Sequence, residues 1–233
     1  MGRTVHIAMH DYELDSLCSF IKLSYKYWKF SGIHSIFEEI WLSAVKQIIS
    51  VWKLEQNHLL SNYSYPLLEH AGRGSAVCYT GMTWSGFRPS DDKCKYNYLI
   101  PANMFAVVCL GYLEEILLNF YRHETPFLRE VKALKQDIDD GIHSFGVVTI
   151  ESRKIYVYET DGCGNFTLMD DANLPSLLSI DYLEYRSSHD PEHIIANNTR
   201  SFVLSPDNPY FFNGTYGKGI GLYLFFRFSS FLH

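Results

Sequence analysis

The chain has 233 residues, a length that fits one domain or part of a larger domain with a single core. Hydrophobic residues make up 47% and charged residues 20%, a composition that excludes a disordered tail or a fibrous repeat. The formal net charge of −6 argues against a nucleic-acid partner, because such proteins carry a basic surface. No apolar run approaches the roughly 20 residues of a membrane span, and the first ten residues lack a signal-peptide pattern. The compartment and the oligomeric state therefore stay unknown.

Apolar residues at helical spacing predict two helices in the first quarter of the chain. One covers residues 14–28 and is expected to end at Gly32, and the second carries an apolar stripe over residues 37–52. Because only a few residues join them, we expect an antiparallel helical hairpin. The loop that follows, at residues 58–92, is rich in Gly, Ser, Pro and aromatic residues, and loops of this length are usually functional.

The rest of the chain alternates between helical patterns and polar loops. The expected elements are helices at 105–120 and 127–142, a β-hairpin at 147–158, a polar loop at 159–175 and short helices at 176–185 and 193–204. The hairpin is predicted from β-branched and aromatic residues on both sides of a short polar stretch. An aromatic run at 222–228 has no amphipathic period, so a strand and a segment outside the fold both stay open.

The five cysteines are an odd number without the spacing of a metal site. Cys18 and Cys109 lie on apolar helical stripes, so we interpret the cysteines as buried free thiols. The sequence also contains four Asn-X-Ser/Thr sequons, which begin at Asn62, Asn165, Asn197 and Asn213. Such sequons matter only in a secreted protein.

The strongest local feature is the run TGMTWSGFRPSDD at residues 80–92, which ends in two adjacent aspartates before a predicted helix. One interpretation is a helix N-cap. The other is a general acid, because Asp91 and Asp92 cannot both ionise freely if they are buried, so one pKa should rise. In the second case Arg88 would orient a carboxylate, and Trp84 would form the floor of a sugar subsite.

Two further segments are rich in carboxylates. In the run DGCGNFTLMDDAN, we favour hydrogen bonds from sugar hydroxyls to Asp170, Asp171 and Asn173, with turn and capping chemistry as the alternative. A calcium loop is disfavoured because the EF-hand spacing is absent. At residues 12–16, capping and a ligand contact by Asp15 both stay open. The ten histidines form no metal-binding motif, so we expect no metal and no cofactor.

Taken together, these segments resemble glycoside hydrolase family 125. The resemblance covers residues 11–221 and is carried, in the family's order, by YELDSLC (12–18), YTGMTWSGFRPSDD (79–92), YLIPANMFAVV (98–108), YETDG (158–162), LMDDANLPSLLS (168–179) and GKGIG (217–221). A motif as long as TGMTWSGFRPSDD is too specific for a chance match.

The resemblance implies a mainly α fold, an incomplete (α/α)6 barrel with the small β-hairpin near residues 147–158. It also implies an inverting exo-α-1,6-mannosidase that releases non-reducing mannose from α-1,6-mannosides, such as N-glycan fragments, without a metal. Asp91 matches the family's general acid. The residues expected to shape the sugar subsite are Asp15, Trp84, Arg88, Asp92, Asp170, Asp171 and Asn173.

An inverting enzyme also needs a carboxylate about 6.5–9.5 Å from the acid to activate water. The family's general base is a Glu in a segment after GKGIG, and no residue of this chain matches it. A Trp-Leu-Arg-Asp-Ser motif of the family's N-terminal region is also unmatched. We therefore expect residues 1–221 to be a partial catalytic domain with uncovered apolar faces, and residues 222–233 to be a tail outside the family. The alternative is an inactive truncated homologue, at most a weak mannoside binder.

Overall fold

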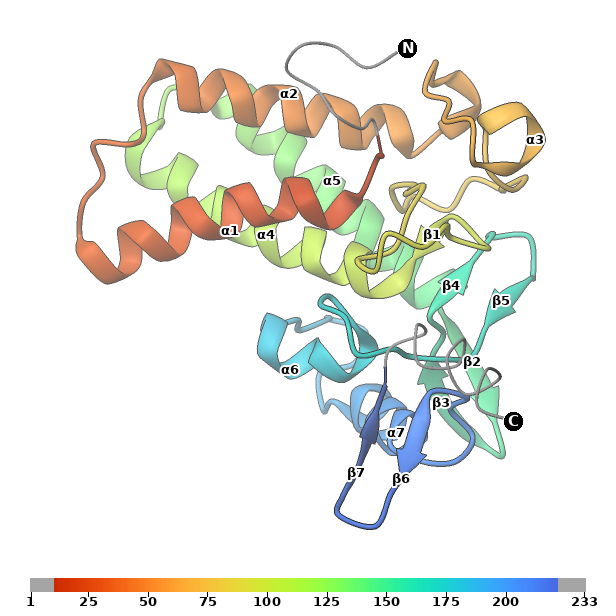
Figure 1. Cartoon of the computed structure of the whole chain (residues 1–233). Helices are drawn as coiled ribbons and strands as arrows, with labels where there is room; N and C mark the ends of the chain where they lie inside the picture. Colours follow the sequence, from red (N-terminus) through yellow and green to blue (C-terminus); the bar gives the residue numbers. More distant parts are fainter. Residues whose placement is uncertain (1–10, 222–233) are drawn as a thin grey trace.

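The computed structural model describes residues 11–221 and shows a mainly α architecture, as predicted (Figure 1). The helices are α1 (Leu14–Ser31), α2 (Glu39–Glu55), α3 (Glu69–Gly72), α4 (Ile100–Phe120), α5 (Thr125–Phe145), α6 (Ile180–Leu183) and α7 (Ile194–Val203), with 3-10 turns at His58–Leu60 and Leu177–Ser179. The strands are β1 (Tyr98–Leu99), β2 (Val147–Ile150), β3 (Arg153–Tyr156), β4 (Glu159–Thr160), β5 (Phe166–Thr167), β6 (Phe211–Asn213) and β7 (Lys218–Ile220). The predicted tail at 222–233 lies outside the described residues.

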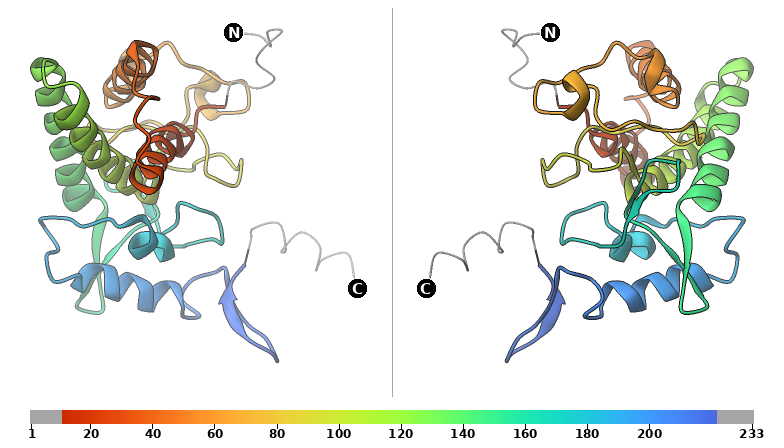
Figure 2. Two further views of the ribbon diagram at one scale, coloured as in Figure 1. Left: turned by 90° about the vertical axis from the view of Figure 1, so that its left-hand side faces the viewer. Right: turned by 90° about the vertical axis from the view of Figure 1, so that its right-hand side faces the viewer.

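Two helical hairpins form one end of the molecule, and α7 with the β6–β7 hairpin lies at the other (Figures 1 and 2). Helix α1 ends where the sequence predicted, because Gly32 adopts a φ of 70°, a left-handed conformation that glycine reaches without strain. The Gly32 N–H donates to the Trp28 carbonyl at 2.8 Å, which satisfies one of the last carbonyls of the helix. Helix α4 packs along both α1 and α5.

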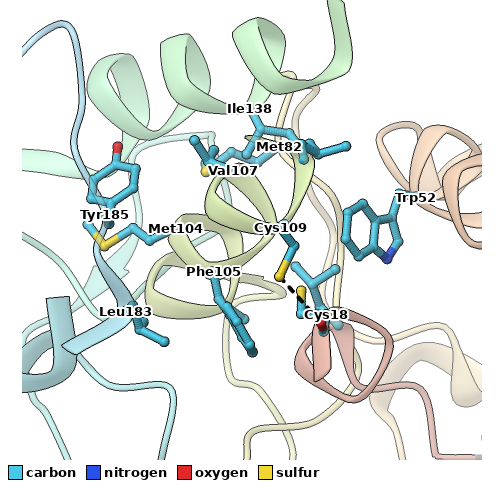
Figure 3. Close-up of a cluster of buried hydrophobic side chains, with 14 of the residues drawn as sticks. Cys18, Trp52, Met82, Met104, Phe105, Val107, Cys109, Ile138, Leu183 and Tyr185 are labelled. Carbon is cyan, nitrogen blue, oxygen red and sulfur yellow. Dashed lines mark hydrogen bonds between the residues drawn. The ribbon is translucent and has the colours of Figure 1, made fainter. Parts of the chain in front are cut away.

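Helix α4 is the centre of the hydrophobic core. Among residues 11–221 it is the one helix long and apolar enough to match a membrane span, yet 78% of its most apolar window is buried inside the protein. A helix that is apolar on every side belongs to a core of this kind. Figure 3 shows Val107 near Ile138 of α5, and the Cys109 thiol donates to the Cys18 carbonyl of α1 at 3.3 Å.

Short strands join the helical end to α7. The predicted hairpin is confirmed as β2 and β3, whose register pairs Val147 with Tyr156, and α7 packs against β3. The sequence did not predict the three-stranded antiparallel sheet in the order β1-β4-β5, nor the β6–β7 hairpin. Strands of two or three residues are too short to show a periodic pattern.

One disulfide joins Cys78 to Cys163, so the prediction of free thiols is wrong for this pair. It connects two polar loops that lie 85 residues apart in the sequence. Cys18, Cys94 and Cys109 are buried free thiols, as predicted for the two helical ones.

One side of α1 exposes apolar side chains to solvent. Four of its exposed side chains follow one another at helical spacing: Phe20, Leu23, Tyr27 and Phe30. Leu23 is 72% exposed and Phe30 is 87% exposed. Such a stripe normally packs against another helix. Within the described residues no helix covers this stripe.

Candidate active site

The segment that carries the long motif runs through the core and is fixed there by amide side chains. The Thr83 N–H donates to Asn103 Oδ1 at 2.9 Å, and Asn103 Nδ2 donates back to the Thr83 carbonyl at 3.0 Å. Two residues later, Asn97 Nδ2 donates to the Ser85 carbonyl at 2.9 Å, and the Ser85 N–H donates to the Asn97 backbone carbonyl at 2.8 Å. Because Asn103 lies on α4, the motif is anchored to the central helix of the hydrophobic core.

Asp91 lies at the tip of a tight turn that ends this segment. The Arg88 N–H donates to the Asp92 carbonyl at 2.8 Å, and the Asp91 N–H donates to the Arg88 carbonyl at 3.0 Å. Asp91 has a φ of 62°, in the left-handed region that aspartate tolerates better than most residues. The turn therefore presents an exposed Asp91 side chain from a fixed backbone.

The capping interpretation of this aspartate pair is wrong, because α4 begins only at Ile100, after strand β1. The general-acid argument from two adjacent carboxylates required a buried pair, and that condition is not met, since Asp91 is exposed and Asp92 is half-buried. The Ser90 hydroxyl donates to Asp92 Oδ2 at 3.0 Å, which fixes the orientation of the second carboxylate.

The start of α1 is tied to the same segment. The Gly86 N–H donates to the Tyr12 carbonyl at 3.0 Å, and the Leu14 N–H donates to Ser85 Oγ at 3.2 Å. Glu13 occupies the N-cap position of α1, but its side chain makes no capping bond, so capping is also wrong here. Instead, Ser85 satisfies the first amide of the helix.

These bonds bring Glu13, Asp15 and Asp91 together, and we call the three residues the carboxyl cluster. Burial, with the charges of Asp15 and Asp91 nearby, raises the pKa of Glu13 to about 7. Burial and the Asp91 charge raise the pKa of Asp15 to about 6. Within residues 11–221, Asp15 Oδ1 is shielded from solvent and has no hydrogen-bond partner. Near neutral pH the cluster can therefore hold or release a proton, as a site for acid catalysis requires.

Trp84 does not form the floor of a sugar subsite, because its side chain is 0% exposed. The His58 ring stacks on it with centroids 3.8 Å apart and planes 1° from parallel, and the Tyr12 ring also stacks on it at 6.2 Å. His58 Nδ1 lies 2.5 Å from Glu55 Oε2, which holds the imidazole in place. The role of Trp84 is to support Tyr12, the residue before Glu13.

Arg88 orients a carboxylate, as predicted, but that carboxylate is Glu159. Arg88 Nε donates to Glu159 Oε1 at 2.5 Å, and the other Glu159 oxygen accepts from the Lys95 and Tyr96 N–H groups at 3.0 Å each. Because Glu159 is fully buried, this ion pair fixes the Asp91 turn to strand β4. The sequence analysis did not single out Glu159, although a glutamate directly after the apolar and aromatic run at residues 155–158 indicates a buried, paired charge.

Asp170 is also a structural residue, so its predicted contact with sugar is wrong. Its two carboxylate oxygens accept from the Leu177 and Leu178 N–H groups at 2.9 and 2.8 Å and hold the 3-10 turn there. Burial raises the pKa of Asp170 to about 7, against the effect of these bonds. Asp171 is 1% exposed and accepts from the Asn173 N–H at 3.2 Å, so turn chemistry explains it too.

Tyr158 connects the loop of Asp171 with the loop of Asp91. Its hydroxyl donates to Asp171 Oδ2 at 3.4 Å, and the Arg88 guanidinium lies 5.4 Å from the centroid of its ring. Asn173 is half-exposed. Of the predicted substrate contacts, Asp15, Asp92 and Asn173 therefore stay predictions, and Trp84 and the Asp170–Asp171 pair are corrected.

A comparison with known proteins places these features in a family. The sequence profile of the metal-independent alpha-mannosidases (GH125) matches residues 3–223. The chain belongs to this family, glycoside hydrolase family 125, whose fold is an α/α barrel.

Two relatives show how much of the family's length the chain represents. It is 39% identical over 230 residues to the meiotically up-regulated gene 157 protein of Schizosaccharomyces pombe. The aligned region covers 90% of this chain and 44% of that protein. It is 42% identical to a solved metal-independent α-mannosidase of Streptococcus pneumoniae in a non-productive complex with α-1,6-mannobiose. That structure matches with a TM-score of 0.85, over 93% of this chain and 53% of the other. The chain thus spans about half the length of these relatives.

Proposed function

We propose that the chain acts as an inverting exo-α-1,6-mannosidase in which Asp91 is the general acid. The observation that carries this proposal is the exposed Asp91 carboxyl on a turn closed by two backbone hydrogen bonds. It lies beside Glu13 and Asp15, and the pKa values of these two neighbours are raised. Membership of an α-mannosidase family supports the class of reaction. The α-1,6-mannobiose bound by the pneumococcal relative supports the linkage.

In this reaction Asp91 donates a proton to the glycosidic oxygen as the bond from that oxygen to the mannose C1 breaks. Water attacks C1 from the opposite face and loses its proton to a second carboxylate, which inverts the anomeric centre. No residue of this chain matches the family's base. Glu13, whose pKa lies near neutrality, keeps a proton close to Asp91 at the pH at which the acid must act.

The test is the release of mannose from α-1,6-mannobiose by the purified chain and by Asp91→Asn. We expect slow release by the parent, because the missing base should reduce the rate by about 10²–10⁴-fold. Asp91→Asn should lose a further factor of about 10² or more, the typical contribution of a general acid. Proton NMR of the first anomer formed reports inversion, and α-1,2- and α-1,3-mannobiose report the linkage preference. Equal rates for parent and variant would remove Asp91 from this role.

The second candidate is a mannoside-binding protein without hydrolysis. It is favoured by the commitment of Trp84, Asp170 and Asp171 to the protein interior, which leaves fewer groups for the transition state. Titration of the chain with α-1,6-mannobiose, followed by NMR, tests it. Binding that Asp15→Asn weakens, without any release of mannose, would favour this candidate over the enzyme.

A further inference from the structure

We propose that Asn62 is an N-glycosylation site and that the chain matures in an oxidising secretory compartment. Two independent observations carry this proposal, which does not depend on the mannosidase function. One is the Cys78–Cys163 disulfide, and the other is the placement of the sequon that begins at Asn62.

The disulfide indicates the compartment. Disulfides form and persist in secretory and extracellular environments and are rare where thiols are kept reduced. The two thiols lose two protons and two electrons, and the disulfide of a thiol oxidoreductase accepts them and becomes a dithiol. The backbone is arranged for the pairing, because the Cys78 N–H donates to the Asp161 carbonyl at 2.9 Å, two residues before Cys163.

Two of the four sequons have side chains that the fold uses internally. At Asn197 the sequon lies in helix α7, and its Thr199 hydroxyl is buried, donates to the Ile195 carbonyl at 2.7 Å and accepts the Tyr156 N–H at 2.8 Å. At Asn165 the side-chain amide donates to Asp161 Oδ2 at 2.7 Å. A glycan on the Asn165 nitrogen would disturb the turn that Asp161 holds.

The sequon at Asn62 is free of such commitments. It follows the 3-10 turn His58–Leu60 in a surface loop, the setting in which glycosylated sequons are found. Asn62 and Ser64 are both exposed, and within residues 11–221 the Asn62 side chain makes no hydrogen bond. Tyr63 between them faces inward, where its hydroxyl accepts the Tyr12 N–H at 3.0 Å. The extended loop therefore presents both sequon side chains to solvent.

The sequon at Asn213 differs in its backbone. Asn213 and Thr215 are exposed, but Asn213 pairs with Lys218 in the β6–β7 hairpin. The sequon at Asn62 thus lies in a loop outside any strand pairing, and its asparagine amide and serine hydroxyl are both exposed.

The modification transfers an oligosaccharide from a lipid diphosphate donor. Asn62 Nδ2 forms a bond to C1 of the first sugar, and the bond from C1 to the diphosphate oxygen breaks. The lipid diphosphate leaves with the electron pair of that bond, and the amide nitrogen loses one proton. The product is a neutral, bulky group on the surface.

The experiment uses the protein purified from the cells that naturally produce it, with free thiols alkylated during lysis. Peptide-N-glycosidase in heavy-oxygen water converts a glycosylated Asn to Asp that carries the heavy isotope, and mass spectrometry locates it. We expect the label at residue 62, no label at residue 165 and a peptide that links Cys78 to Cys163. Unmodified Asn62 would overturn the proposal, and so would alkylated Cys78 and Cys163.

Variants made at the chain's own locus provide matched controls. Asn62→Gln and Ser64→Ala should each increase the gel mobility by one glycan, although Ser64→Ala keeps the asparagine. Asn165→Gln should leave the mobility unchanged. Unchanged mobility for Asn62→Gln contradicts the proposal, and the wild-type peptide map decides the same point if a variant fails to accumulate.

Discussion

Replacing Glu13 with glutamine should change how the stability of the protein depends on pH. The pKa of Glu13 is raised from its ordinary 4.5 to about 7, mainly by burial. Between these values the folded state binds more protons than the unfolded state, so stability falls as pH rises. The contribution of protonated Glu13 is complete below the unfolded pKa and is lost as pH passes through about 7. Glutamine is neutral at every pH, so the stability of Glu13→Gln does not fall in this way as pH rises.

The size of the effect follows from the same pKa. One pKa unit corresponds to about 1.4 kcal/mol, so the full rise from 4.5 to about 7 represents at most about 3.5 kcal/mol. Glu13 is only partly buried, and solvent screening reduces this to about 1–2 kcal/mol. Relative to the parent, Glu13→Gln should therefore show no difference near pH 4 and gain about 1–2 kcal/mol near pH 8.

Urea unfolding at closely spaced pH values measures this difference in the free energy of unfolding. Glu192→Gln is the matched control, because Glu192 is exposed and lies outside the carboxyl cluster. Carboxyl carbon NMR provides a direct check, since Asp91→Asn removes a neighbouring charge and should lower the pKa of Glu13. A difference between Glu13→Gln and the parent that does not vary with pH would refute the reasoning.

Three further tests concern the residues that support the site, each by urea unfolding at neutral pH. Trp84→Ala should destabilise the fold by about 3–5 kcal/mol, because the ring is fully buried; a loss under about 1 kcal/mol would contradict this packing role. Arg88→Met should destabilise by about 3–5 kcal/mol by leaving buried Glu159 unpaired, and adding Glu159→Gln should recover part of the loss. Replacing Cys78 and Cys163 with serine should destabilise by about 2–4 kcal/mol, since the bridge closes a loop of 85 residues; no change without reductant would count against the bridge.

The positions of the long helices were predictable from the sequence because a helix is indicated by the local spacing of its apolar residues. Helix α1 and its end at Gly32 agree with the pattern, and so do α2, α5 and the β2–β3 hairpin. Helix α4 begins earlier than predicted, at Ile100, because it is buried on all sides and shows no periodic contrast at its start. The strands of the β1-β4-β5 sheet depend on partners far away in the chain, so no local pattern indicates them.

The sequence indicated some of the candidate groups, and tertiary packing decided which of them come together and what each one contacts. The long motif established the family and indicated Asp91. It did not show that Trp84 packs against His58, nor that Arg88 pairs with Glu159, because both partners are distant in the sequence. A pKa depends on burial and on neighbouring charges, which exist only once the chain is folded. For that reason the sequence did not indicate Glu13 as a member of the carboxyl cluster. The structure shows it there, because Ser85 and Gly86 hold the start of α1 beside the Asp91 turn.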